Sequence, residues 1–368
     1  MDAALARLVD QVQTARAARG RLRIVGGDTK AFYGNPATGE PLDVKPLAGI
    51  SSYEPSELVV TVRGGTLLAD LEAVLADKGQ HLAFEPPRYV ARGTVGGMVA
   101  AGLAGPARAT AGGVRDHVLG ATLLNGRGEL LSFGGQVMKN VAGYDVSRAL
   151  AGSMGVLGVV CEVSLKVLPV APASATMRFE CGQAEALTRL NAWGGEPLPI
   201  TGSAWWNGML VVRLAGARAA VESAQRLFEG QGGEAIDAPL AAVFWRGLRD
   251  HGDEFFAAAA RAEDAGAALW RLGVPATAAP LLLPGEQLIE WGGAQRWWCT
   301  SASAATVRDV AAQAGGHATL FRAPAARRGD AFHPLAPVQA RIQQALADAF
   351  DPDRVFDRGR LFGATPTA

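Results

Sequence analysis

The feature of this sequence that most constrains its fold is a glycine-rich stretch between Arg92 and Asp116. Glycines recur along it with almost no bulky side chains between them: Gly93, Gly96, Gly97, Gly102, Gly105, Gly112 and Gly113. Glycine costs backbone entropy on folding, so such a run is tolerated where the backbone takes a positive φ or comes very close to another group. Exposed backbone N–H groups without Cβ atoms also form concavities that suit an anion such as a pyrophosphate.

A loose linker is the alternative interpretation of this stretch. However, Val95, Met98, Val99 and Leu103 recur within it at the spacing of one helix face. Bulky apolar residues at that spacing predict a short helix that packs against a core. We therefore expect the stretch to be folded and packed.

Length, charge and cysteine content exclude several classes of function. The 368 residues suffice for two domains, and 49% hydrophobic with 19% charged residues is typical of a well-cored globular protein. The formal net charge is zero and no basic patch is evident, so we expect no nucleic-acid partner. Cys161, Cys181 and Cys299 form no CxxC pair, which argues against an iron–sulfur or zinc site in this chain and fits a reducing cytoplasm.

The sequence predicts no transmembrane segment. The longest apolar candidate, Ala149–Val160, is interrupted by glycines and is much shorter than the ~20 residues that a spanning helix needs. The first twenty residues mix alanine and leucine with charged residues, so they predict an amphipathic helix ending at Gly20 rather than a signal peptide. Attachment to a membrane through a partner subunit stays open.

Regular elements are predicted on both sides of the glycine-rich stretch. Leu22–Val25 predicts a strand that breaks into the turn Gly26-Gly27-Asp28-Thr29-Lys30, which is either a phosphate cradle without Walker A spacing or a plain turn. Leu58–Val62 predicts another strand, and Thr66 is a candidate N-cap for a helix over 67–78. Residues 118–133 predict a hairpin that turns at Asn125–Gly128.

The segment over 151–158 nearly matches a dinucleotide-binding motif and a catalytic motif, and both matches are rejected. Gly152, Gly155 and Gly158 are three residues apart, so they do not form the GxGxxG fingerprint of a Rossmann unit. Ser153 in AGSMG lacks the first glycine of a nucleophile elbow, so a serine hydrolase is poorly supported.

The composition changes after Pro172, which divides the chain into domains. All eight tryptophans follow this point, and we expect them to be core and interface residues rather than platforms for substrate. Strands alternate with helices here, which suggests an α+β cap domain with a ferredoxin-like sheet. The strands are expected at 176–180, 205–214, 287–291, 296–301 and 317–322, the helices at 184–193, 217–229 and 303–314. The resulting division is 1–172, 173–336 and 337–368, the last containing one amphipathic helix over 337–350 and a tail.

Taken together and in order, these motifs resemble a known flavoprotein family. The segments GGDTK, LVVTVRGGTLLADLEAVLADKG, GTVGGMVAAGLAGPARATAGGVRDHVLG and KNVAGYDVSRALAGSMGVLGVVCEVSLKVLP are similar to the FAD-binding domain of the vanillyl-alcohol-oxidase superfamily, over roughly residues 20–170. The C-terminal FDPDRVFDRGRLF is similar to the tail of that family. Within it, the KNVAGYD string and the short cap most resemble the FAD-binding E subunits of bacterial glycolate oxidases.

This resemblance implies the fold and the cofactor. It implies an α+β protein with a two-subdomain α/β FAD-binding domain of the vanillyl-alcohol-oxidase (PCMH) type and a smaller α+β cap domain over the isoalloxazine ring. Three runs would contact the FAD: Gly26, Gly27, Asp28, Thr29 and Lys30; then Thr94, Val95, Gly96, Gly97, Ala101, Gly102, Gly112, Gly113, Arg115 and Asp116; then Gly152, Gly155, Gly158, Val159 and Val160. Lys30, Arg108 or Arg115 would supply counter-charge, with surface ion pairing as the alternative for each.

Departures from the family pattern limit these implications. The first two runs contain no histidine or cysteine for covalent attachment, so we expect non-covalent FAD. The cap histidines are isolated, so no metal site is expected. Asp357 and Arg358 replace the asparagine and proline of the family tail, which makes Asp357 a poor candidate for a flavin contact. Arg322 or Arg296 would suit a substrate carboxylate, with a plain surface arginine as the alternative.

The resemblance implies an FAD-dependent oxidoreductase acting on CH–OH donors. The chain would be the FAD-binding subunit of a glycolate oxidase complex, a cytoplasmic assembly that supports oxidation of glycolate to glyoxylate. Its partners would be a homologous FAD-containing catalytic subunit and an iron–sulfur subunit, through which it could reach the inner membrane. The alternatives are a stand-alone dehydrogenase of D-lactate or glycolate and a non-catalytic scaffold that has lost flavin. No catalytic base is assigned.

Overall fold

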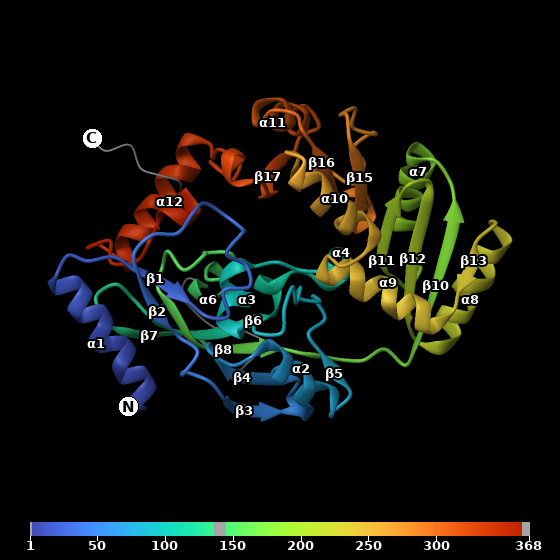
Figure 1. Ribbon diagram of the computed structural model, residues 1–368. Helices are drawn as coiled ribbons and strands as arrows, with labels where there is room; N and C mark the ends of the chain where they lie inside the picture. The colour runs from blue at the N-terminus through green and yellow to red at the C-terminus, as the bar shows by residue number, and fades with distance from the viewer. Residues whose placement is uncertain (1, 136–144, 363–368) are drawn as a thin grey trace. The chain divides into compact units, whose positions relative to one another are not determined.

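The computed structural model describes residues 2–135 and 145–362 (Figure 1). The chain divides into two compact units. Unit 1 comprises residues 1–103, 113–169 and 334–368, and unit 2 comprises residues 104–112 and 170–333. Unit 2 therefore includes a short segment of the glycine-rich stretch, which the division expected from the sequence did not assign to it. Lys139–Tyr144 of the KNVAGYD string and the last residues of the tail lie outside the described part of the chain.

The larger sheet of unit 1 is antiparallel and has the order β3-β4-β8-β6-β7. Its central strands are buried because valine, leucine and alanine fill both of their faces. The predicted hairpin is confirmed: β6 and β7 pair from Gly120 with Gly134 to Leu124 with Leu130. The strands are β3 (Ile50–Glu54), β4 (Val59–Arg63), β6 (Val118–Leu124), β7 (Leu130–Gly134) and β8 (Val159–Lys166).

Two helices of unit 1 connect these strands to the glycine-rich stretch. Helix α2 (Leu68–Ala76) begins two residues after Thr66, and the predicted N-cap role of Thr66 is wrong. The Thr66 hydroxyl instead donates to the carbonyl of Gly49 at 3.1 Å and accepts from its N–H at 2.9 Å, which ties two loops together. Helix α3 (Val95–Ala101) is the short helix predicted from the apolar spacing, and Val95, Met98 and Val99 are buried in it as expected.

The two ends of the chain meet in a second part of unit 1. Strands β1 (Leu22–Val25) and β2 (Glu40–Asp43) run parallel, and Phe356 of the tail bridges to Leu22. Helix α1 (Ala3–Ala17) packs on them, so Leu8, Val12 and Leu42 share a core with the tail. Helix α12 (Pro337–Phe350) precedes the tail and has the predicted bounds.

Asp351 fixes the tail after α12. The side chain is fully buried, and its two oxygens accept hydrogen bonds from the N–H groups of Val355 and Phe356, each at 2.9 Å. Replacement of Asp351 by Ala leaves both buried donors unsatisfied, so we expect a loss of about 3 kcal/mol in the free energy of unfolding. Urea denaturation measures this loss. Asp351→Asn retains one acceptor oxygen and should lose less, and equal stability of both variants and the native chain would contradict the anchoring role.

Unit 2 is built around one antiparallel sheet with the order β13-β10-β12-β11-β15-β16-β14-β17. Its first half follows the sequence β10-α7-β11-β12-α8-β13, which is the ferredoxin-like βαββαβ arrangement expected from the sequence. The second half repeats this strand order with β14, β15, β16 and β17, but a loop over 275–285 replaces its first helix. The two halves join where Ala204 and Trp205 of β11 pair with β15.

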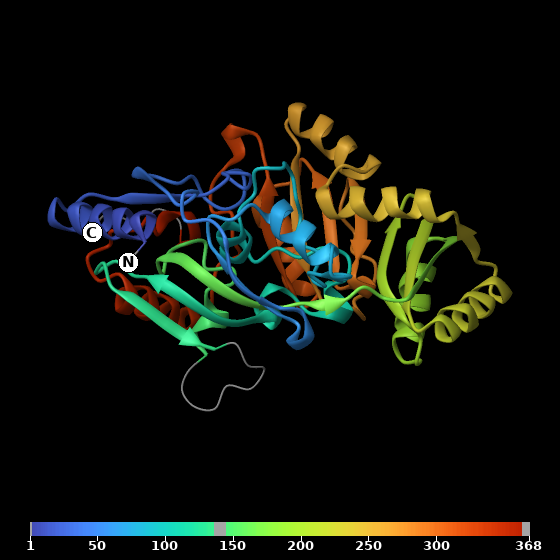
Figure 2. The same cartoon turned by 90° about the horizontal axis from the view of Figure 1, so that it is seen from below.

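Helices cover both faces of this sheet. Helices α7 (Gln183–Gly194), α8 (Arg218–Gly230) and α11 (Ala304–Gln313) pack on one face. Helices α9 (Ala238–Asp250) and α10 (Glu254–Asp264), gold in Figure 2, pack on the other. The strands are β10 (Ala173–Glu180), β11 (Ile200–Trp206), β12 (Met209–Gly216), β13 (Glu234–Ile236), β14 (Ala268–Gly273), β15 (Glu286–Glu290), β16 (Gln295–Thr300) and β17 (His317–Arg322).

One predicted strand of the cap is wrong. The expected strand over 205–214 is two strands, β11 and β12, which turn at Asn207 and Gly208 with φ of 48° and 80°. An Asn-Gly pair with two positive φ values is the turn that best matches the twist of a two-residue hairpin. Most tryptophans are core residues, as expected: Trp193, Trp245, Trp270, Trp297 and Trp298 are buried.

Candidate functional site

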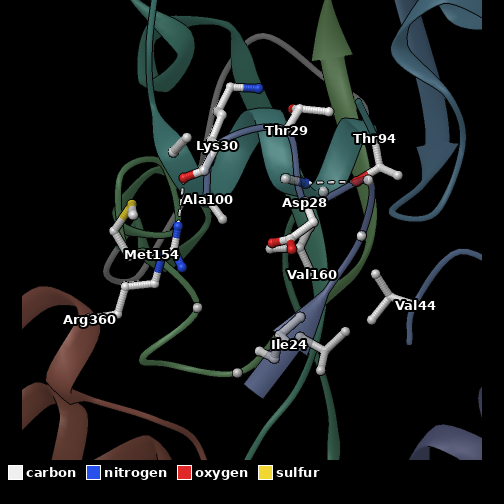
Figure 3. Close-up of a pocket in the computed structure, with 18 residues that line it drawn as sticks. Ile24, Asp28, Thr29, Lys30, Val44, Thr94, Ala100, Met154, Val160 and Arg360 are labelled. Atoms are coloured by element: carbon white, nitrogen blue, oxygen red, sulfur yellow. Dashed lines mark hydrogen bonds between the residues drawn. The ribbon is translucent and has the colours of Figure 1, made fainter. Parts of the chain in front are cut away.

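Five segments of unit 1 that are distant in the sequence, Val44 after β2 being the shortest, line one pocket (Figure 3). The other four are the end of β1 with the following turn, helix α3 with its cap Thr94, the glycine-containing run that begins at Met154, and the C-terminal tail. The empty volume is about 790 Å³ with the open mouth included, which lies in the range of cofactor sites. The lining residues are Ile24, Gly26, Gly27, Asp28, Thr29, Lys30, Val44, Thr94, Gly96, Gly97, Ala100, Ala101, Met154, Gly155, Gly158, Val159, Val160 and Arg360.

The turn over residues 26–30 forms the polar side of the pocket. Its backbone N–H groups have no acceptor within the part of the chain that the structure describes. Asp28 has a φ of 52°, and such a left-handed residue among right-handed or extended ones makes successive N–H groups converge. A row of converging N–H groups that no protein carbonyl uses suits the oxygens of a phosphate, so this turn fits the diphosphate of FAD.

Lys30 brings a partly buried positive charge to the same turn. Its ammonium lies 5.8 Å from the ring centre of Tyr89 and has no carboxylate partner among the described residues. Burial lowers the pKa of Lys30 to about 8, because the charged form loses hydration without gaining an ion pair. An anion bound in the pocket would favour the charged ammonium and raise the pKa of Lys30 again.

The glycines of the turn are required by protein contacts. A Cβ atom on Gly27 would lie 1.7 Å from the carbonyl oxygen of Arg92, and one on Gly26 would lie 2.4 Å from the hydroxyl of Thr94. The turn thus packs directly on the strand-like residues before α3. Gly97 is different, because a Cβ there meets only the Thr94 hydroxyl, at 3.1 Å, while the residue itself lines the pocket.

Helix α3 supplies a flat wall and few free donors. Thr94 caps the helix by accepting from the N–H of Gly97 at 3.2 Å, and the N–H of Gly96 donates to Gly64 at 2.8 Å. These donors are therefore used within the protein. What α3 offers the pocket is a surface of Gly96, Gly97, Ala100 and Ala101, whose small side chains let a planar ring lie close to the backbone.

Several residues expected at the site do not line this pocket. Val95 is in the core, Gly102 ends α3 with a left-handed conformation, and the Asp116 side chain accepts from the N–H of Gly113. Arg115 and Gly152 are also absent from the lining. Arg108 and Gly112 belong to unit 2, where the Arg108 guanidinium lies 4.6 Å from the ring centre of Trp291.

Sequence reasoning missed five lining residues: Ile24, Val44, Ala100, Met154 and Arg360. Ile24, Ala100 and Met154 lie in a predicted strand or within two residues of predicted site residues, so neighbourhood alone could have suggested them, whereas Val44 follows β2, a strand that the sequence did not predict. Arg360 lies in the tail that resembles the family, but nothing in the pattern singled it out. Asp357 does not line the pocket; its carboxylate accepts from the N–H groups of Thr38 at 2.7 Å and Gly359 at 3.0 Å.

The cap arginines proposed for a substrate carboxylate differ in their surroundings. Arg296 is completely buried, so it is not the surface arginine of the alternative interpretation. It donates to the carbonyls of Gly293 at 2.7 Å and Ala278 at 3.0 Å, which holds the loop that replaces a helix in the second half-sheet. Burial lowers the pKa of Arg296 to about 10. Arg322 is partly buried near His251 and Glu263.

Comparison with known proteins identifies the class of this site. The profile of a family described as FAD binding domain matches residues 4–134. Two solved structures of alkyldihydroxyacetonephosphate synthase superpose with TM-scores of 0.63 and 0.61, at 13% identity, over 95% of this chain and 74% of theirs. The fold class predicted from the sequence is confirmed.

Curated relatives fall into two groups. Glycolate oxidase subunit GlcE of Escherichia coli is 44% identical over 96% of this chain and 96% of its own length. D-lactate dehydrogenase of Anaerostipes hadrus and glycolate oxidase subunit GlcD of Bacillus subtilis are 34% and 32% identical, over 36% and 34% of this chain. These two matches span only 27% and 26% of the relatives' own lengths.

The fold and the pocket thus define an FAD-binding flavoprotein of the vanillyl-alcohol-oxidase (PCMH) type. Within that class the chain belongs to the family of glycolate oxidase subunit GlcE. The described residues contain no helix that is long and apolar enough to cross a bilayer, and no cluster of three or more metal-ligating side chains.

Proposed function

We propose that this chain is the FAD-binding subunit of a glycolate oxidase complex and holds FAD non-covalently in the pocket of unit 1. The observation that carries the proposal is the convergence on one pocket of a turn with unused N–H groups and a wall of glycine and alanine. The close similarity to subunit GlcE supports the complex and its substrate, glycolate.

Each segment has a role in this proposal. The turn over 26–30, with Lys30, binds the diphosphate, and the small residues of α3 allow close approach of a planar ring. Gly155, Gly158, Val159 and Val160 complete the wall together with Ile24 and Val44, and their apolar surface excludes water. The pocket lining contains no histidine and no cysteine among the described residues, in keeping with non-covalent binding.

When bound, FAD supplies the redox chemistry, accepting a hydride from a 2-hydroxy acid and passing electrons on. The chain itself binds and orients the cofactor, and we assign no catalytic base to it. A homologous FAD-containing subunit and an iron–sulfur subunit are the proposed partners, and through them the complex reaches the inner membrane. Among the expected residues outside the pocket lining, Arg115 is the one we propose for a contact made in the complete complex.

The test is spectroscopic. Protein purified alone is expected to be yellow, with the two absorption bands of flavin, and to release its FAD on denaturation. Protein that is colourless and takes up no added FAD would refute the proposal and favour the scaffold alternative.

A second measurement separates a subunit from a complete enzyme. The isolated chain is expected to reduce an artificial dye with glycolate only when the partner subunits are added. Turnover of glycolate or D-lactate by the isolated chain at an ordinary enzymatic rate, tens of events per second, would favour the stand-alone dehydrogenase. Co-purification from the native source, followed by iron analysis of the companions, tests the iron–sulfur partner.

A further inference from the structure

The C-terminal tail is held against the strand and the turn that begin the pocket. The N–H of Leu22 donates to Val355 at 2.7 Å, and the N–H of Asp357 donates back to Leu22 at 3.0 Å. Asn35 donates to Gly359 through its side chain and to Arg360 through its backbone. This hydrogen-bonded ladder brings residue 360 beside residues 24–30, more than three hundred positions earlier in the chain.

Arg360 projects from this tail into the pocket (Figure 3). One terminal nitrogen, Nη2, donates to the carbonyl of Lys30 at 2.7 Å and to that of Tyr33 at 3.1 Å. The remaining guanidinium N–H groups, on Nε and Nη1, have no acceptor in the described part of the chain. Neither nitrogen is among the buried side-chain atoms that lack a partner, so both are accessible to a ligand. Arg360 therefore fixes the turn with one side of its fork and leaves the other side available to a ligand.

No carboxylate among the described residues forms a close ion pair with Arg360, so its charge is available to an anionic ligand. Burial lowers the pKa of Arg360, the carboxylates of Asp28 and Asp357 raise it, and Arg23 lowers it again. Asp28 lies 3.9 Å from Arg23, and Asp357 is hydrogen bonded to backbone N–H groups, so neither forms a close ion pair with Arg360. With Lys30 on the same turn, two cations border the unused N–H groups of residues 26–30.

We propose that Arg360 is the second cationic contact of the FAD diphosphate, so that the C-terminal tail completes the cofactor site. This inference rests on the proposed binding of FAD by this pocket. A guanidinium presents paired donors that match phosphate oxygens, and hydrogen bonds between such charged groups are about twice as strong as neutral ones. The tail thereby contributes both the geometry of the turn and part of the charge that the diphosphate meets.

The test compares two replacements of Arg360 by titration of the cofactor-free protein with FAD. Arg360→Gln keeps an N–H donor for a carbonyl but removes the charge, so the dissociation constant for FAD should rise about 10- to 100-fold. Arg360→Lys keeps the charge but not the fork, and we expect it to recover most of that loss. ADP, which carries the diphosphate without the flavin, should lose affinity by a similar factor when it competes with FAD.

A matched control is Arg354→Gln, which changes an exposed arginine of the same tail and should leave FAD affinity unchanged. A change of less than twofold in Arg360→Gln would overturn the inference. Equal weakening by Gln and Lys, with the same fall in the melting temperature of the cofactor-free protein, would also overturn it, because Arg360 would then act only as a clamp on the turn. If the native chain itself binds no FAD, the proposed function fails instead.

Discussion

Gly97→Leu is expected to lower the affinity for FAD at least about 100-fold while leaving the protein folded. A Cβ on Gly97 would meet only the Thr94 hydroxyl at 3.1 Å, so a longer side chain extends into the pocket rather than into the protein. There it occupies the space where α3 would lie against a planar ring. Leucine also favours a helix more than glycine, so the melting temperature should stay the same or rise.

The measurement is titration with FAD followed by flavin fluorescence, together with thermal denaturation of the cofactor-free protein. Gly194→Leu is the matched control, because Gly194 is also helical, has nothing within 4 Å of an added Cβ and lies in α7 of unit 2. Native affinity in Gly97→Leu would show that the cofactor does not lie against α3. Loss of folding would show that Gly97 is packed more closely than the structure indicates.

The second large effect is a dependence of FAD binding on pH above 8. Burial lowers the pKa of Lys30 from its ordinary value of 10.5 to about 8 in the cofactor-free protein. Below pH 8 the ammonium is already charged, and the diphosphate can pair with it directly. Above pH 8 binding must take up a proton, so the dissociation constant for FAD should rise by up to about tenfold per pH unit.

The same shift has a consequence of opposite sign for the protein without cofactor. Between pH 8 and pH 10.5 the unfolded chain holds a proton on Lys30 that the folded chain has lost, so this group makes the folded state more stable as pH rises. FAD affinity and intrinsic stability should thus change in opposite directions across this window.

Lys30→Arg separates this proton from others, since a guanidinium stays charged throughout the range. FAD is titrated at half-unit steps from pH 7 to 9.5, a range that extends about one and a half pH units above the pKa of Lys30. The dissociation constant of Lys30→Arg should stay constant over this range. A slope in Lys30→Arg equal to that of the native chain would assign the proton to another group.

Local patterns predicted much of this fold. The apolar spacing of Val95, Met98 and Val99 located α3, and alternating residues with a tight turn located the β6–β7 hairpin, because both signals depend on neighbours in the sequence. Asn207-Gly208 is an equally local turn signal, but the prediction of one strand over 205–214 did not use it. Helices α9 and α10 and strand β14 were not predicted, although Ala241, Trp245 and Leu248 recur along α9 at the spacing of one helix face.

The site residues were likewise predicted in part. The turn over 26–30 and the small residues of α3 were expected at the site and do line one pocket, whereas Val95 and Asp116 serve packing and capping. For Val95 the sequence contained the reason, since this residue belongs to the apolar face of the helix. Membership of a motif therefore did not distinguish a residue that touches the pocket from one that supports it.

From the sequence alone came the glycine-rich segments, and the resemblance of these segments, in their order, to an FAD-binding family, because each motif is read within one short stretch of chain. Only the tertiary structure decided which of those segments share a pocket and that Arg360 joins them. That contact depends on the pairing of the tail with β1. The two segments are more than three hundred residues apart, and neither sequence by itself indicates that it pairs with the other.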